Sequence, residues 1–288
     1  QKEGGEALVK LALTSGASSY TYTNESSNAI LRIKHTEQPW SQKAQVVIDD
    51  FDNVLSALSL EGYQGILSYG YRTSAGDEFS ATAPLKVKGH ERINNNGAIR
   101  SLLDLYGLGD QVSDDHALSN LALASSDTQT VKTLITAIMG ATLAPFSHCT
   151  AVTVTYDSED SLIDTFIPKD YFRVTIGDTR AAKVKELLGY TKCVGIFKAD
   201  GQFHIFSPTS GTTYDYTYRN DFVATSHGFF SKVYRTPLVL PNKIIVQSSS
   251  DHQPFYTGNA TSAASFALLP KTGKPIVMRL SSNAQATS

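Results

Sequence analysis

The stretch DTRAAKVKELLGYTKCVGIFKADGQFHIFSP, from Asp178 to Pro208, predicts a short helix followed by a β-hairpin. Asp178 or Thr179 can cap the helix, because a side-chain oxygen at this position accepts a hydrogen bond from a free amide of the first turn. Four apolar residues recur at helical spacing on one face: Ala181, Val184, Leu187 and Leu188. Gly189 then supplies the end of the helix.

The hairpin is expected from two apolar runs, Cys193 to Lys198 and Gln202 to Ser207, joined by Ala199-Asp200-Gly201. An Asp-Gly pair between such runs is a strong hairpin signal, because a type I′ turn needs positive φ at both central positions. An isolated pair of strands is only marginally stable in water, and the helix has an apolar face to cover. We therefore expect this unit to form the core of a domain in the second half of the chain.

Composition indicates a folded, mainly β protein. The chain has 288 residues, 41% of them hydrophobic, which suffices for one large or two modest domains with a sizeable core. Only 18% of the residues are charged, and 14 Tyr and 13 Phe together with many Ser and Thr favour strands. The resulting polar, uncharged surface suits permanent packing against other subunits, although many secreted β proteins share it.

Partners and anchors are constrained by charge and hydropathy. The formal net charge of -2 gives no support for a sequence-specific nucleic-acid ligand or an anionic membrane. No apolar run approaches the length of a membrane span, and no signal peptide is apparent, so we expect no membrane anchor. Cys149 and Cys193 form no metal-type spacing and are expected to be buried, small apolar residues.

Residues 1–93 are predicted to form an antiparallel β-barrel-like domain. Strands follow one another with short polar turns and no helix between them, which is typical of a barrel or a sandwich. The expected strands are Glu6–Thr14, Ser19–Thr23, Ile30–Thr36, Ala44–Asp49, Gly62–Arg72 and Phe79–Lys88.

Residues 94–145 are predicted to be a helical connector. After Asn94-Asn95-Asn96-Gly97, the apolar residues from Ile99 to Tyr106 take helical spacing and Gly107 ends the run. A second amphipathic helix is expected at Thr130–Gly140, TVKTLITAIMG.

Residues 146–248 are predicted to form an α+β domain that contains the opening helix and hairpin. Its further strands are expected at Cys149–Tyr156, Thr213–Arg219, Phe229–Arg235 and Lys243–Gln247. The Ser-, Ala- and Thr-rich residues 249–288 are expected to be extended or mobile. The predicted fold class is therefore α+β, mainly β.

Acidic residues gather in two loops, which hold Asp49, Asp50 and Asp52 in one case and Asp157, Glu159, Asp160 and Asp164 in the other. A glycosidase needs two carboxylates that face each other across a cleft, and the spacing here selects no pair. The first loop lacks the oxygen ligands and the Gly of an EF-hand, so a solvated loop is the better interpretation. Cation binding in an assembly, with ligands from several chains, stays open.

Histidines and aromatic residues give no catalytic pattern either. The seven histidines are scattered singly: His35, His90, His116, His148, His204, His227 and His252. Core and cross-strand packing is the expected role of Tyr63, Tyr69, Tyr71 and Phe79, although they could also form a stacking platform for sugars. A Ser/His/Asp triad has no positive support, and we predict no catalytic residue, no cofactor and no metal site.

The order of segments resembles a known family. The succession is QPWSQKAQVVIDD, GYQGILSYGY, TSAGDEFSATAPLKVKG, TVKTLITAI, FIPKDYFRV, the helix and hairpin quoted above, and PNKIIVQ. It is similar to the tail proteins of tailed bacteriophages and prophages, in particular the baseplate or tail-tip hub proteins. The resemblance covers roughly Ile30 to Gln247 and rests on order and texture, with no catalytic signature.

The resemblance implies a non-enzymatic structural protein of the virion, assembled in the bacterial host cytoplasm. Its partners would be other tail subunits, and copies would form a homo-oligomeric ring, a trimer or a hexamer, through which the genome passes. The alternative from the residues themselves is a carbohydrate-binding or carbohydrate-cleaving β protein, and a third possibility is a secreted adhesin-like module.

Overall fold

The computed structural model describes residues 6–73, 76–95, 97–209, 241–248, 254–278, 280 and 282–287. Two compact units lie within the chain. The first falls within residues 1–121, 126–168 and 173–208, and the second within 122–125, 169–172 and 209–288. The segment boundaries at residues 93, 145 and 248 stay a prediction from the sequence.

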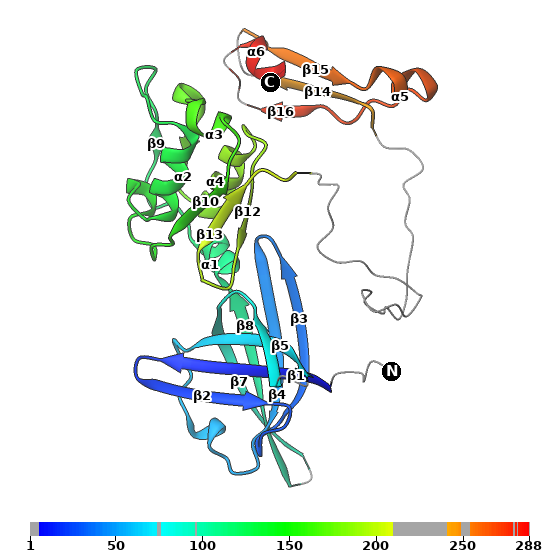
Figure 1. The fold of residues 1–288 in the computed structure, drawn as a ribbon. Helices are drawn as coiled ribbons and strands as arrows, with labels where there is room; N and C mark the ends of the chain where they lie inside the picture. Colours follow the sequence, from blue (N-terminus) through cyan, green and yellow to red (C-terminus); the bar gives the residue numbers. More distant parts are fainter. Residues whose placement is uncertain are drawn as a thin grey trace. The chain divides into compact units, whose positions relative to one another are not determined.

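Residues 6–107 form one antiparallel sheet, drawn from blue to cyan in Figure 1, which we call the β part. Its strand order is β2-β1-β5-β7-β8-β4-β3, with β6 beside β5. The strands are β1 (Glu6–Ser15), β2 (Ser18–Thr23), β3 (Ile30–Gln38), β4 (Ser41–Asp49), β5 (Gln64–Thr73), β6 (Gly76–Ala81), β7 (Leu85–Asn95) and β8 (Ala98–Gly107), with the short helix η1 (Leu55–Ala57) after β4.

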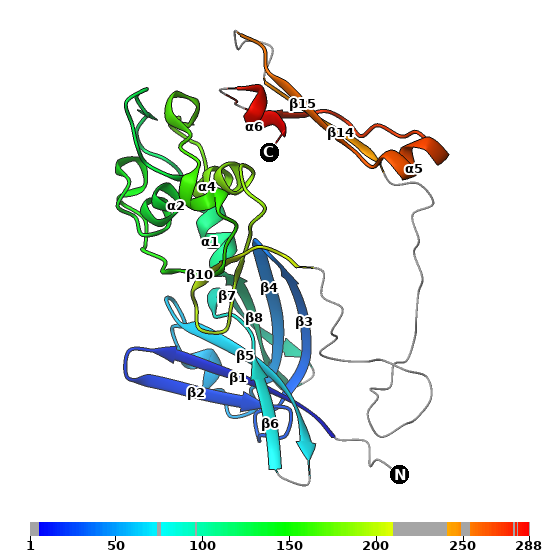
Figure 2. The same ribbon diagram turned by 45° about the horizontal axis from the view of Figure 1, so that its top comes forward.

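The sheet curls around a single apolar core (Figure 2). Buried residues come from seven of its strands and from η1, among them Leu11, Leu13, Val46, Ile48, Leu67, Leu85, Leu103 and Leu105. These side chains alternate along their strands, because successive residues of a strand point to opposite faces. The mainly β, antiparallel class is confirmed. In the described pairings β2 and β3 are end strands, so a closed barrel is not formed by them.

The helix expected at Ile99–Tyr106 is wrong, because these residues form strand β8. The buried positions are Ser101, Leu103 and Leu105, which repeat with the period of a strand. Leu102 and Leu103 are adjacent, which gave the apolar residues an apparent helical spacing. The alternation of buried and exposed residues was hard to see in the sequence, because one of its buried positions is the polar residue Ser101. Gly97, with φ of +84°, belongs to the turn that joins β7 to β8, which is a hairpin connection rather than the start of a connector. The single strand expected at 79–88 is likewise two strands, β6 and β7.

The second part of the first unit comprises residues 108–121, 126–168 and 173–208, and we call it the α/β part. Its elements are α1 (Leu108–Asp114), α2 (Val131–Met139), η2 (Ala144–Phe146), β10 (Val154–Ser158), α3 (Leu162–Thr165), β11 (Arg173–Val174), α4 (Arg180–Leu188), β12 (Val194–Phe197) and β13 (Phe203–Phe206). The short elements β9 (Leu121–Ala122) and η3 (Lys169–Tyr171) interrupt it.

Both helices expected here are confirmed. Thr130 caps α2 and Thr179 caps α4, each accepting a hydrogen bond from an amide three residues ahead. The two helices pack against each other. The buried face of α4 contains the four apolar residues expected there, and Arg180 and Lys183 with them.

The expected hairpin is also confirmed, as β12 and β13 in a three-stranded sheet of order β10-β13-β12. Its turn is not type I′. Gly201 has φ of +76°, whereas Asp200 has no positive φ, and the Gly201 amide donates to the Lys198 carbonyl at 2.9 Å. This is a type I turn followed by a glycine bulge. The strand expected at 149–156 is only partly right, because β10 begins at Val154 and pairs parallel to β13.

The second unit contains a three-stranded sheet of order β15-β14-β16. Its elements are β14 (Lys243–Ser248), β15 (Thr257–Thr261), α5 (Ala263–Leu268), β16 (Ile276–Met278) and α6 (Asn283–Thr287). The strand expected at 243–247 is confirmed. An extended or mobile tail is wrong for the described residues, because β15 and β16 pair with the two edges of β14. The strands expected at 213–219 and 229–235 lie outside the described residues.

Candidate functional site

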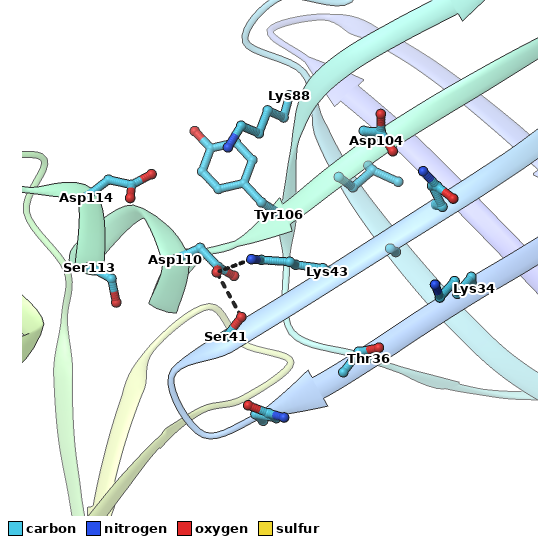
Figure 3. Close-up of a pocket in the computed structure, with 14 residues that line it drawn as sticks. Lys34, Thr36, Ser41, Lys43, Lys88, Asp104, Tyr106, Asp110, Ser113 and Asp114 are labelled. Carbon is cyan, nitrogen blue, oxygen red and sulfur yellow. Dashed lines mark hydrogen bonds and ion pairs between the residues drawn. The ribbon is translucent and has the colours of Figure 1, made fainter.

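A pocket of about 500 Å³ lies on the outer face of the β part, beside α1 (Figure 3). This volume is in the range of small-molecule sites. The side chains of its floor come from alternate positions of three neighbouring strands, as the register shows. Lys34, Gln45 and Asp104 face one another across β3, β4 and β8, and Thr36, Lys43 and Tyr106 form the next row.

Asp110 of α1 forms one wall of this pocket and is held by three groups. Its carboxylate accepts hydrogen bonds from Ser41 Oγ and from the Gln42 amide, both at 2.8 Å, and Lys43 Nζ lies 3.7 Å away (Figure 3). Because these donors come from the start of β4, Asp110 anchors α1 to the sheet. The residue is therefore structural in this position, and it fixes the shape of the pocket.

Other charges in the pocket are not neutralised in this way. Within the described part of the chain, Lys34 and Asp104 form no ion pair, and Lys88 lies over the Tyr106 ring at 5.5 Å from its centroid. The lining includes amines, carboxylates, two amides, hydroxyls and one aromatic ring. Such a lining can bind a polar ligand or a partner's side chains, and it gives no preference for a polyanion.

The acidic loop after β4 is exposed at Phe51 and Asp52, as expected of a solvated loop, but Asp50 departs from that prediction. Asp50 is fully buried, and its carboxylate accepts hydrogen bonds from the Leu55 amide, from the Ser56 amide and hydroxyl, and from Ser101 Oγ. Burial alone would raise the pKa of Asp50, but these hydrogen bonds outweigh it and hold the pKa below its usual value. Burial, with Asp50 and Asp52 nearby, raises the pKa of Tyr22 to about 12.

The second acidic loop separates into two clusters. Lys132 Nζ lies 2.5 Å from Glu159 and 3.1 Å from Asp164, and 4.6 Å from the centroid of the Tyr156 ring. Hydrogen bonding to Glu159, together with the weaker contact to Asp164, raises the pKa of Lys132. Lys132 therefore joins Glu159 and Asp164 in one ion-pair cluster, in which both carboxylates already have a partner.

Asp157 belongs to the other cluster, with His204, Lys198 and Asp200. His204 Nδ1 lies 3.0 Å from Asp157, and His204 Nε2 lies 2.8 Å from Asp200. Lys198 Nζ lies 2.6 Å from Asp157. Sequence spacing places Asp200 and His204 four residues apart, but Asp157 reaches them only because β10 lies parallel to β13.

The remaining candidate histidines do not converge. His35 contacts Gln42 and Tyr69, and His90 contacts Ser101. Burial lowers the pKa of both rings, opposed by Glu37 and Asp50 respectively. The ring of His116 contacts the Asp114 carbonyl, and the ring of His148 contacts the thiol of Cys149. His227 and His252 lie outside the described residues. Within the described residues, no group of three or more His, Cys, Asp or Glu side chains could hold a metal ion.

Cysteine and aromatic predictions are met in part. Cys193 is buried as expected, whereas Cys149 is half-buried, and both are free thiols. Tyr63 packs against the core, and Tyr69 stacks on His35 with centroids 5.8 Å apart. Tyr71 is 61% exposed, so it does not pack as expected. In the part of the chain that the structure describes, no helix has the length and apolar character of a bilayer span.

Arg180 is a buried residue that sequence reasoning missed. Its guanidinium donates to the Ile138 and Met139 carbonyls at the end of α2, to the Thr150 carbonyl at 2.9 Å, and to Asp115 at 2.6 Å. We call these contacts the Arg180 cluster. The sequence did indicate that Arg180 would be buried, because position 180 lies on the same helical face as Val184 and Leu187.

Comparison with known proteins identifies the fold. No protein-family model matches the sequence, and no curated protein sequence matches it. The tail protein of Neisseria meningitidis MC58 superposes with a TM-score of 0.62 at 10% identity, over 96% of this chain and 73% of that one. The 43 kDa tail protein of prophage MuSo2 from Shewanella oneidensis gives 0.54 at 14% identity, over 96% and 76%.

A third similar solved structure is a two-protein complex. The Francisella PdpA–VgrG complex, in its half-lidded form, gives a TM-score of 0.50 at 9% identity over 96% of this chain and 44% of that one. At such identities the likeness establishes the fold. The resemblance expected from the sequence is therefore confirmed at this level: the chain has the fold of phage and prophage tail proteins.

Proposed function

We propose that this protein is a structural subunit of a phage or prophage tail, of the baseplate-hub type, and that copies of it pack into a ring. The observation that carries the proposal is the superposition of 96% of the chain on two tail proteins. Both parts of the first unit and the second unit fall within that span, so the likeness is not confined to one of them. The partners would be other tail subunits, and the location would be the virion.

A structural rather than catalytic role is supported by the way the candidate acids are used. Asp50 is enclosed by hydrogen-bond donors, Asp110 anchors α1, and Glu159 and Asp164 share Lys132. Each of these carboxylates already holds two segments of the fold together.

Tail particles provide the direct test of this proposal. The full chain carrying a short epitope would be produced together with the tail genes of its own phage or prophage, and purified particles would be imaged by negative stain with a labelled antibody. We expect label at one end of the tail. Particles that assemble normally and carry no label, although the protein is soluble in the same cells, would contradict the proposal.

A carbohydrate-binding role is the second candidate, and the pocket beside α1 favours it. Three lysines and three aspartates line this pocket around the ring of Tyr106, so its surface is polar without an excess of either charge. Such a pocket is a better candidate site for a polyhydroxylated ligand than the surface around the exposed Tyr71. A glycan array would separate the two positions. A signal lost in Tyr106→Ala and kept in Tyr71→Ala would support this role, and no signal with the wild-type chain would remove it.

A further inference from the structure

His204, in the middle of β13, lies between two carboxylates. Its side chain is buried, with 7% of the residue exposed, and the two ring nitrogens lie 3.0 Å from Asp157 and 2.8 Å from Asp200. An ionised carboxylate only accepts hydrogen bonds, so each contact requires an N–H on the ring. A neutral imidazole has one N–H. The two contacts can therefore exist together only when the ring is an imidazolium cation.

Both carboxylates are kept ionised by other donors as well. Hydrogen bonds from Lys198 and then His204 hold the pKa of Asp157 below its usual value. The Gln202 amide, followed by His204, does the same for the pKa of Asp200. Among the described residues, the charged groups that face this ring are Asp157 from β10 and Asp200 from the turn, with Lys198 behind Asp157. Whether both contacts exist therefore depends on the protonation state of the ring itself.

The His204 ring and its two carboxylates lie where the hairpin meets β10, so the protonation state of the ring affects how these segments are held together. Asp157 sits at the irregularity in the pairing of β10 with β13, and Asp200 lies in the turn of the hairpin. That hairpin contacts the β part. A Cβ placed on Gly201 would lie 3.5 Å from Pro84, and the Phe203 ring lies 4.9 Å from the ring of Trp40 in the turn between β3 and β4.

We propose that protonation of His204 tightens the contact of the hairpin with the β part, and that loss of the proton loosens it. A neutral ring keeps one carboxylate contact and gives up the other, so either the turn or β10 loses one of its ties to β13, while the backbone hydrogen bonds remain. An imidazole in water loses its proton near pH 6.5. The stabilisation requires the imidazolium, so it is lost when the ring gives up its proton. The pKa of each carboxyl is held below its usual value, so these groups take up protons, and the contacts are lost again, only at more acidic pH.

The chain contains its own reporter for this contact. Trp40 is the single tryptophan in the sequence, and it lies between the Phe203 ring and Lys185 Nζ, which is 4.8 Å from its ring centroid. The backbone of Trp40 is also held closely, since a Cβ on Gly109 would lie 2.8 Å from its carbonyl carbon and oxygen. Fluorescence of the wild-type chain therefore reads the junction without a label.

The test measures acrylamide quenching of Trp40 in the full chain between about pH 5.5 and pH 8. We expect the quenching constant to rise about two-fold across this range in the wild type and to stay flat in His204→Gln. His148→Gln, which changes a histidine outside the cluster, should keep the wild-type profile. A flat wild-type profile, or an unchanged rise in His204→Gln, would overturn the proposal.

A second variant covers the case in which His204→Gln does not fold. Asp200→Asn keeps a side-chain oxygen for the Gln202 amide, and its NH2 group can donate to the unprotonated Nε2 of a neutral ring, so both contacts no longer require an imidazolium. We expect its pH dependence to be much reduced. Nitrogen chemical shifts of the His204 ring give an independent readout: both nitrogens should be protonated at about pH 5.5 in the wild type, and a single protonated nitrogen there would refute the geometry.

Discussion

The β part and the α/β part each enclose a charged side chain completely, but the two charges hold different things together. Asp50 accepts from the loop that follows it, through Leu55 and Ser56, and from one distant residue, Ser101. Arg180 reaches the end of α2, the loop at Thr150 and Asp115 after α1. One charge organises a local loop, and the other joins segments 30 to 65 residues apart in the chain.

This difference follows from how each part obtains its long-range contacts. The β part has strands of 6 to 11 residues whose backbone ladders already join distant segments. The α/β part has strands of two to five residues, and it has short helices whose hydrogen bonds are mostly internal. A guanidinium with five donors can supply the missing cross-links, because it bonds several carbonyls at once.

The largest effect is expected from a charge in either apolar core. Leu187→Asp in α4 and Leu103→Asp in β8 each place a carboxylate at a fully buried position. Each should cost about 4 kcal/mol or more and unfold its own part, or block assembly. Urea unfolding followed by far-UV circular dichroism measures this. A soluble, normally assembling Leu187→Asp variant would show that the wrong face of α4 has been placed inward.

Removal of the Arg180 guanidinium should come next. Arg180→Met keeps the volume and leaves Asp115 and the carbonyls of Ile138 and Thr150 without their donor, at a cost of about 3 to 5 kcal/mol. Arg180→Lys should recover only part of this loss, because an ammonium cannot reach acceptors in that many directions. Equal stability of the lysine variant and the wild type would contradict the role of the cluster.

Asp50→Asn should have a smaller effect, confined to the β part. An amide in place of the carboxylate turns one acceptor into a donor, which faces the Leu55 and Ser56 amides and costs about 2 kcal/mol. The pKa of Asp50 is lowered on folding, so its contribution is present above about pH 4 and is lost as the pH falls through the folded value. Acid unfolding of Asp50→Asn should therefore be shallower than that of the wild type, and an identical acid profile would rule this out.

The helix caps should give the smallest effect. Thr179→Ala and Thr130→Ala each remove one side-chain acceptor from the first turn of a helix. Each should cost about 1 kcal/mol in thermal unfolding, since the cap is a single partly exposed hydrogen bond.

Local signals predicted a helix and a hairpin of the α/β part, and five of the six strands expected in residues 1–93 are present in the β part. Helix α4, its cap at Thr179 and the hairpin at Gly201 could be read from neighbouring letters. Strand β8 could not, because Leu102 and Leu103 imitate a helical spacing and the true alternation depends on pairing with β4 and β7. Its identity as a strand is decided by tertiary contacts rather than by propensity.

The sites were less predictable than the fold for a related reason. Arg180 has partners at positions 115, 138, 139 and 150, and the pocket beside α1 is assembled from β3, β4, β7, β8 and α1. No spacing in the sequence marks such sets. Asp50 and Asp157 were identified as candidate acids from the sequence. The burial of Asp50 and the partners of Asp157 depend on which strands become neighbours, which the sequence does not show.

The native mass of the full chain at micromolar concentration tests the central claim most directly. A subunit that packs into a ring should have the mass of a trimer or a hexamer, by mass photometry or light scattering, and negative-stain images of the same sample should show closed rings. A strict monomer across the concentration range, with no tendency to join rings or tail particles, would contradict the account.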